Sequence, residues 1–141
     1  MIAFVRLTDA VSVAGQMTPD RIAQAAAEGF RAVINNRPDG EEPNQSTEAE
    51  VQAAAEAAGL AYRFIPVAQG FSREQVTARA AALAADGPIL AFCRSGTRST
   101  NLWALAEASR GADADALIEA AASGGYDISG LRPTLVSLSG T

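Results

Sequence analysis

The sequence predicts a single α/β domain in which helices flank a parallel-rich central sheet. Short apolar runs that suit strands covered on both faces alternate with segments of helical spacing, which begin at capping residues and end at glycine. Three helix-then-strand units follow one another, and such units join parallel strands through right-handed crossovers. A chain of 141 residues can bury one full core but not two, so we assign residues 1–141 to one domain.

Five segments are predicted to form the sheet. They comprise residues 3–7, 12–14, 30–35, 61–67 and 89–92. A turn at residues 8–10 separates the first two segments, and Pro66 interrupts the fourth. We expect the strands around residues 33, 63 and 90 to pair in parallel, because a helical segment lies between each of them and the next.

Six helices are predicted from caps, glycine stops and helical spacing. They run from Thr18 to Gly29, from Ser46 or Thr47 to about Ala58, from Ser72 to about Ala85, and over residues 99–109, 113–122 and 129–138. At the first, a hydroxyl cap precedes Pro19 and Asp20, and at the third, Ser72 and Gln75 have the spacing of a capping box. Trp103 lies on the fourth helix and is expected in the core.

The loop of residues 93–99, Cys-Arg-Ser-Gly-Thr-Arg-Ser, is the candidate active site. Cys93 is expected where a buried strand passes into a helix, so that its sulfur faces free backbone N–H groups and the positive end of the helix dipole. Gly96 permits a turn in which N–H groups converge on one point, and Arg98 can place a permanent charge there. Such surroundings favour a thiolate, so Cys93, Arg98 and Ser99 are predicted to be catalytic.

Other residues near this loop are predicted to bind an anionic substrate. Carboxyl ends of parallel strands meet at one edge of a sheet, so the loops after residues 35, 67 and 92 should share a crevice. The predicted substrate-binding residues are Arg94, Ser95, Gly96, Thr97, Arg37 and Gln69. Ser99 is expected to donate its hydroxyl to the Cys93 sulfur. One alternative is that Arg94 is a solvated surface residue. Another is that Cys93 is inert and packed in the core. A loop this rich in arginine and hydroxyl groups does not suit a core strand, which argues against the second alternative.

The composition excludes several classes of function. A net charge of −5 does not suit nucleic-acid binding. The chain has no histidine, its eleven basic residues are all arginine, and Cys93 is its one cysteine. These counts exclude a histidine base, a lysine Schiff base, an internal disulfide and a zinc site of histidine and cysteine, and we expect neither metal nor other cofactor. With no signal-peptide core and no apolar run that could cross a bilayer, the chain is predicted to be cytoplasmic and not to bind membranes.

Three motifs together resemble one known family. They are Cys-Arg-Ser-Gly-Thr-Arg-Ser at residues 93–99, Asn-Asn-Arg-Pro-Asp-Gly-Glu at 35–41 and Tyr-Arg-Phe-Ile-Pro-Val at 62–67. At these separations they resemble the phosphatase-like domain of the beta-lactamase hydrolase-like proteins. The resemblance spans nearly the whole chain and implies the fold of cysteine-dependent protein tyrosine and dual-specificity phosphatases. In some members a metallo-beta-lactamase-like domain associated with persulfide oxidation follows, which implies such a protein as a partner.

Within this resemblance the chain departs from dual-specificity phosphatases at two places. Those enzymes carry His-Cys, five residues and then Arg, whereas here Phe92 precedes the cysteine and four residues separate Cys93 from Arg98, as in rhodanese-type sulfur transferases. They also carry an aspartate where this chain has Gln69, and an amide cannot protonate a leaving alkoxide. We therefore interpret the chain as a sulfur transferase that forms a persulfide on Cys93, with thiosulfate or a glutathione persulfide as donor.

Two further functions stay open at this stage. One is a phosphatase in which a phosphate ester transfers its phosphoryl group to Cys93, with Asp39 as a substitute acid from a neighbouring loop. A turn-forming role after Pro38 is the simpler explanation of Asp39. The other is a non-catalytic domain that binds an anion or docks a partner while keeping the phosphatase shape. The presence of both Cys93 and Arg98 favours an enzyme.

Overall fold

A five-stranded sheet organises the computed structural model, which describes residues 4–68, 70–82 and 87–140. Its strands are β1 (Val5–Arg6), β2 (Val11–Ala14), β3 (Ala32–Asn35), β4 (Ala61–Phe64) and β5 (Ile89–Phe92), and they lie in the order β1-β2-β5-β3-β4. β1 and β2 are antiparallel, whereas β2 with β5, β5 with β3, and β3 with β4 are parallel. The predicted parallel pairing of the last three strands along the chain is therefore confirmed.

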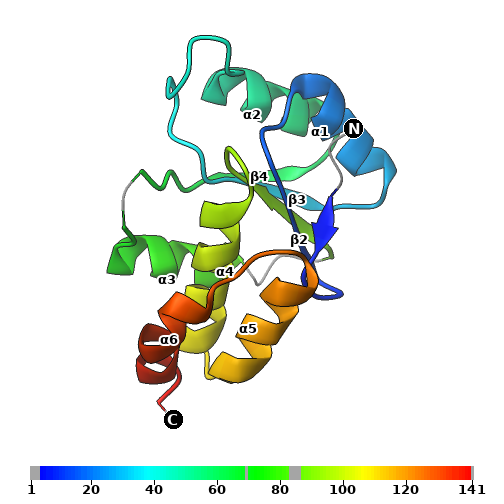
Figure 1. The fold of residues 1–141 in the computed structure, drawn as a ribbon. Coiled ribbons are helices and arrows are strands. Elements are labelled where there is room, and N and C mark those ends of the chain that lie inside the picture. The colour runs from blue at the N-terminus through cyan, green and yellow to red at the C-terminus, as the bar shows by residue number, and fades with distance from the viewer. Residues whose placement is uncertain (1–3, 69, 83–86, 141) are drawn as a thin grey trace.

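Helices cover both faces of this sheet (Figure 1). They are α1 (Pro19–Ala27), α2 (Glu48–Ala57), α3 (Arg73–Ala82), α4 (Thr97–Ser109), α5 (Ala114–Ser123) and α6 (Arg132–Ser139), with a 3-10 turn, η1 (Ser129–Leu131), before the last. α1 and α2 cover one face, where Ile22 and Val51 pack in one core cluster with Val33. The other helices cover the opposite face, where Trp103 is fully buried, as predicted, in a second cluster. The sheet is thus enclosed between two apolar layers.

The predicted capping residues fix where the helices begin. The Thr18 hydroxyl accepts a hydrogen bond from the N–H of Arg21 at the start of α1. Thr47 and Glu50 form a reciprocal capping box at the start of α2, and Ser72 and Gln75 form the same pair of bonds before α3. These local bonds satisfy N–H groups that a helix terminus leaves free, and so they favour a helix start at these positions.

Some predicted boundaries differ from the structure. α4 begins at Thr97 rather than at Ser99, because Gly96 in the left-handed conformation ends the loop directly before it. The fourth strand ends at Phe64, ahead of Pro66. The predicted helix 129–138 is divided into η1 and α6, because Pro133 has no N–H to continue the helical ladder. Three predicted positions, Ala3, Gln69 and Ala85, lie outside the described residues.

Candidate active site

The loops after β3, β4 and β5 meet at one edge of the sheet, and Asn36 connects them. Its backbone N–H donates to the carbonyl of Phe92 at 2.8 Å, and its backbone carbonyl accepts from the N–H of Val67 at 2.9 Å. Its side-chain amide donates to the carbonyl of Ile65 at 2.9 Å, and its side-chain oxygen accepts from the Ser99 hydroxyl at 2.8 Å. Asn36 is fully buried, so it holds three strand ends in a fixed relation to the start of α4.

Cys93 lies fully buried between β5 and α4, at the predicted passage from strand to helix. The backbone N–H of Gly96 donates to its Sγ at 3.1 Å. The φ of Gly96 is +91°, a left-handed conformation that glycine adopts without steric cost. The hydroxyl and N–H of Thr100 both donate to the Gly96 carbonyl, at 2.8 and 2.9 Å, and join the loop to the first turn of α4. The loop therefore directs an amide at the sulfur, as predicted.

An acidic side chain from another loop holds the guanidinium of Arg98. Nη1 and Nη2 donate to the Glu41 carboxylate at 2.8 and 2.9 Å, and Nη1 also donates to the carbonyl of Val67 at 2.6 Å. The pKa of Arg98 is raised mainly by this bond to Glu41, and the charge of Cys93 and a hydrogen bond to it raise it further. The same bond, followed by that from Arg37, outweighs burial and lowers the pKa of Glu41 to about 2, so Glu41 is ionised at neutral pH.

Arg37 lies buried behind this pair, with its side chain 4% exposed. Its Nε donates to Glu41 at 2.9 Å, Nη1 to the side-chain oxygen of Gln16 at 2.6 Å, and Nη2 to Glu42 at 2.6 Å. All three guanidinium nitrogens thus have partners within the protein. In this arrangement Arg37 acts on the site by orienting Glu41, and its predicted contact with a substrate stays a prediction.

The other predicted residues of the loop occupy two different environments. Arg94, Ser95 and Thr97 are exposed at the rim. The Ser95 hydroxyl donates to the Thr97 hydroxyl at 3.1 Å, and Arg94 pairs through Nε with Glu42 at 3.1 Å. Ser99, in contrast, is fully buried. Its one hydroxyl proton goes to the side-chain oxygen of Asn36, so the expected hydrogen bond from this hydroxyl to the sulfur is wrong. Ser99 instead anchors the start of α4.

The predicted substitute acid, Asp39, and the residue at the usual position of the acid, Gln69, stand differently. Asp39 accepts a hydrogen bond from the N–H of Glu48 at 3.0 Å and so ties its loop to the start of α2. Gln69, which takes the place of an aspartate, lies outside the described residues.

Among the side chains that the structure describes, no group of three or more acidic or cysteine residues is arranged to hold a metal ion. Across the described ranges, no helix has the length and apolarity to span a membrane.

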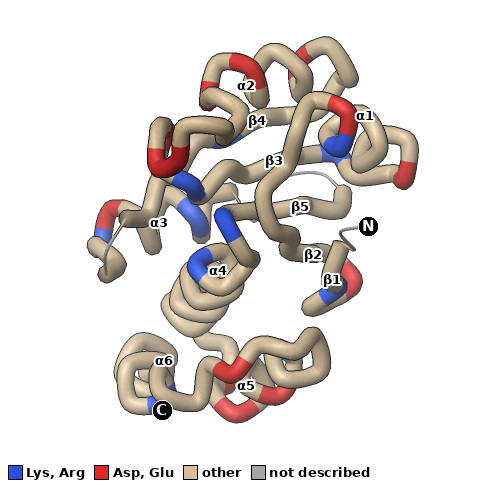
Figure 2. The backbone as a smooth tube through the Cα atoms, turned by 45° about the horizontal axis from the view of Figure 1, so that its top comes forward, with Lys and Arg blue, Asp and Glu red and all other residues tan. Residues whose placement is uncertain are grey.

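Asn36, Glu41 and Tyr126 are residues of the site that were given no role from the sequence. In Figure 2 the acidic segment of the loop between β3 and α2, which carries Glu41, lies close to basic segments of the neighbouring loops. The adjacent acids Glu41 and Glu42, in a loop already placed at the crevice, were a usable signal for such pairing. Tyr126, between α5 and η1, donates its hydroxyl to the carbonyl of Ser95 at 3.0 Å. No local sequence pattern connects these two positions.

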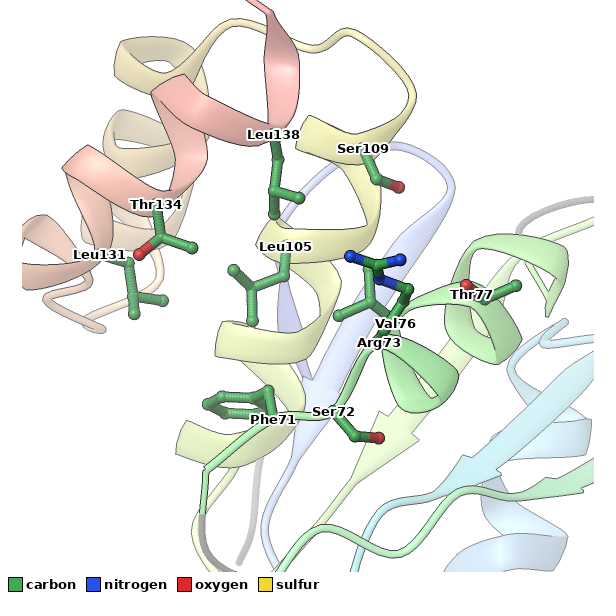
Figure 3. Close-up of a pocket in the computed structure, with 10 residues that line it drawn as sticks. All are labelled: Phe71, Ser72, Arg73, Val76, Thr77, Leu105, Ser109, Leu131, Thr134 and Leu138. Atoms are coloured by element: carbon green, nitrogen blue, oxygen red, sulfur yellow. The ribbon is translucent and has the colours of Figure 1, made fainter.

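A separate pocket lies away from the cysteine loop. It has a volume of about 390 Å³ between α3, α4 and α6, and Phe71, Val76, Leu105 and Leu138 are among the side chains that line it (Figure 3). The residues that line it do not include any from the cysteine loop. Because it does not contain Cys93 or Arg98, we do not assign it to the active site.

A family model matches most of the chain. Residues 3–110 match the beta-lactamase hydrolase-like protein, phosphatase-like domain. The chain belongs to this family. A beta-lactamase hydrolase-like protein of Xylella fastidiosa is 42% identical over 105 residues, which make up 73% of this chain and 24% of that protein. The chain therefore spans about a quarter of the length of the curated relatives that it matches.

Solved structures show the same fold. A protein from Neisseria meningitidis that is assigned as a phosphatase has 29% sequence identity and a TM-score of 0.83, with 98% of this chain and 99% of that chain covered. The active form of Tk-PTP has 20% identity and a TM-score of 0.70, with 97% and 96% covered. The predicted family and the predicted protein tyrosine phosphatase-like fold are both confirmed.

Proposed function

We propose that this domain is a cysteine-dependent phosphatase that hydrolyses phosphate esters through a phosphocysteine on Cys93. The observation that carries the proposal is the placement of Cys93 and Arg98 at the strand-to-helix loop of a phosphatase-like fold. The similarity to the Neisseria meningitidis protein and to Tk-PTP favours this chemistry over the sulfur transfer first expected from the loop length.

In the proposed reaction Cys93 and Arg98 have separate roles. The Cys93 thiolate attacks phosphorus, an S–P bond forms, and the P–O bond of the ester breaks as the leaving oxygen takes the electron pair. Water then attacks phosphorus, the S–P bond breaks, and inorganic phosphate leaves as the thiolate is restored. Arg98 and the loop N–H groups stabilise the charge on the transferring oxygens. Glu41 orients Arg98 through two hydrogen bonds.

The supply of a proton limits the class of ester. Glu41 is ionised, and Asp39 already accepts the N–H of Glu48. Asp39, the proposed acid, is tied by that bond to the start of α2. We therefore propose esters whose leaving group is a stable anion, such as aryl phosphates, since these need little protonation. The rim arginine, Arg94, is proposed to attract their negative charge.

Sulfur transfer is the second candidate, favoured by the four-residue spacing from Cys93 to Arg98 and by the ionised state of Glu41. The Cys93 thiolate would attack the outer sulfur of thiosulfate, the S–S bond would break, and sulfite would leave with the electron pair. The resulting persulfide would pass its outer sulfur to an acceptor thiolate. A metallo-beta-lactamase-like protein that oxidises persulfides is the proposed partner of this reaction.

For either chemistry the Cys93 thiol must stay reduced. We therefore propose a location in the cytoplasm.

Two parallel incubations separate these functions. The reduced protein is treated with para-nitrophenyl phosphate and, separately, with thiosulfate, while turnover and intact mass are recorded. We expect steady release of nitrophenol, which is lost in Cys93→Ser and in Arg98→Gln. Arg132→Gln is the matched control, because Arg132 lies on α6 and pairs with Asp115 at 2.9 Å, away from the loop.

The other outcomes each point to another function. The added mass of one sulfur atom on Cys93, with negligible ester turnover, would replace the phosphatase by the sulfur transferase. If neither nitrophenol nor a persulfide forms, and Cys93→Ser still binds phosphate, the protein is a non-catalytic anion-binding domain.

A further inference from the structure

We infer that Tyr126 is a positioning residue for the nucleophile: its hydroxyl fixes the peptide between Ser95 and Gly96, so that the amide of this peptide points at the Cys93 sulfur. This inference rests on the proposed function, in which Cys93 is the nucleophile. Tyr126 lies beyond residues 3–110, which the family model matches, so membership of the family assigns it no role.

A single peptide group carries both hydrogen bonds. Its carbonyl oxygen, from Ser95, accepts the Tyr126 hydroxyl at 3.0 Å. Its N–H, from Gly96, donates to the Cys93 Sγ at 3.1 Å. In a planar trans peptide the C=O and the N–H point in opposite directions. A bond that holds the oxygen in place therefore also aims the N–H at the sulfur.

The conformation of Gly96 explains why such a restraint matters. Glycine populates positive and negative φ about equally, so the peptide before it can rotate more readily than elsewhere in the chain. Gly96 has a φ of +91°, and a Cβ built on it would overlap the Tyr126 hydroxyl. The loop thus combines a glycine that permits the required turn with a tyrosine that packs directly against that glycine. Rotation of the peptide would break the bond to Tyr126.

Tyr126 is itself held in place. Its N–H donates to the carbonyl of Ala121 at 2.9 Å at the end of α5, and its ring packs against the core cluster between the sheet and α4. Burial, and then the electrostatic effect of Cys93, raise the pKa of Tyr126. The hydroxyl is therefore protonated at neutral pH and able to donate to the Ser95 carbonyl.

The test is the rate at which iodoacetamide alkylates Cys93 as a function of pH, in the wild type, Tyr126→Phe and Tyr62→Phe. We expect Cys93 in Tyr126→Phe to be alkylated about three- to tenfold more slowly at pH 6, which is the range for the loss of one hydrogen bond. The curve of alkylation rate against pH should move to higher pH. Tyr62→Phe is the matched control, because it removes the other tyrosine hydroxyl, which accepts a bond from Asn35 at 3.3 Å. It should follow the wild type.

Three outcomes would decide against this inference in distinguishable ways. An ordinary thiol profile in the wild type would remove the proposed function itself. A reactive wild type with an unchanged Tyr126→Phe profile would overturn the positioning role alone. Thermal unfolding is recorded on the same samples, and a Tyr126→Phe variant that unfolds as a whole would show a structural role instead.

Discussion

Two buried arginines of this chain have opposite surroundings. The Arg37 side chain is 4% exposed and its guanidinium bonds to Gln16, Glu41 and Glu42. Arg79, on α3, is 0% exposed, and none of its guanidinium nitrogens has a hydrogen-bond partner among the described residues. Burial lowers the pKa of Arg79 to about 10, and the charge of Glu107 opposes this only in part. The difference shows where in this fold charge is compensated and where it is not.

The compensated charges lie at the cysteine loop. Arg98, Glu41, Arg37, Glu42 and Arg94 form a chain of alternating charge that joins two of the loops. A buried charge is costly unless it is paired and hydrogen-bonded, and this chain of pairs meets that requirement before any substrate arrives. Arg98 is therefore preorganised beside Cys93. Arg79 has no comparable set of partners in the described part of the chain, so it is expected to lower the stability of the fold.

The largest expected effect is on Arg37. Arg37→Met removes three side-chain hydrogen bonds and leaves Glu41 and Glu42 with less positive charge beside them. We expect the free energy of unfolding to fall by about 2 to 4 kcal/mol, as for breaking a buried pair from one side. Urea unfolding measures this change, with Arg132→Met as an exposed control that should unfold like the wild type. A loss for Arg37→Met no larger than that of the control would show that its bonds do not stabilise the fold.

The opposite sign is expected for Arg79. Arg79→Met keeps a long apolar side chain while removing an uncompensated buried charge, so the free energy of unfolding should rise by about 1 to 3 kcal/mol. The same urea unfolding experiment detects this increase. A decrease of more than about 1 kcal/mol would contradict it and would mean that attraction to Glu107 outweighs the loss of hydration.

The fold could be predicted from the sequence because its signals are local. The cap at Thr18, the capping box of Thr47 with Glu50 and the proline before β5 each act within one turn, and apolar runs between them mark the strands. The position of Cys93 followed from the same reasoning, since a strand that passes into a helix places its last residue at the sheet edge. Misplaced boundaries arose where one residue changed the backbone course, as Pro133 does in the first turn of α6.

The contacts that complete the site could not be predicted in this way. Arg98 and Glu41 are 57 positions apart, and Tyr126 and Ser95 are 31 apart, so each pairing depends on how two distant segments pack. An arginine in a helix is ordinarily expected to face solvent, so nothing in the sequence distinguishes Arg79 from an exposed residue. Ser99 lies in the first turn of α4, but its hydroxyl partner, Asn36, comes from the end of another strand, and its catalytic role stays a prediction.

A smaller effect, dependent on pH, is expected for Glu41. The pKa of Glu41 is lowered from 4.5 to about 2. Its ionised form therefore stabilises the folded state fully above pH 4.5, and this contribution is lost as pH falls through 2. Because the pairs are partly solvated, Glu41→Gln should lower the free energy of unfolding by only about 1 kcal/mol at pH 7. It should also slow turnover, since Arg98 loses its orienting partner.

Unfolding at neutral and at acidic pH tests this expectation. The difference in stability between the wild type and Glu41→Gln should be constant above pH 4.5 and shrink as the pH approaches 2. A difference that stays the same down to the lowest pH would show that charge on Glu41 does not contribute. Glu74→Gln, at the start of α3, is the control with an exposed carboxylate.

The smallest effect on stability, and the sharpest separation of stability from binding, is expected for Arg94. Its side chain is 68% exposed and contacts Glu42 at 3.1 Å, so Arg94→Gln should change the free energy of unfolding by less than about 0.5 kcal/mol. Its place at the rim of the cysteine loop nevertheless lets it attract an incoming anion. We expect phosphate to protect Cys93 from alkylation several-fold less well in Arg94→Gln, and the difference to shrink at high salt, where exposed charges are screened. Arg110→Gln, at the far end of α4, should protect like the wild type. Equal protection in both variants would make Arg94 a solvated surface residue and would leave Arg98 and the loop amides to bind the anion.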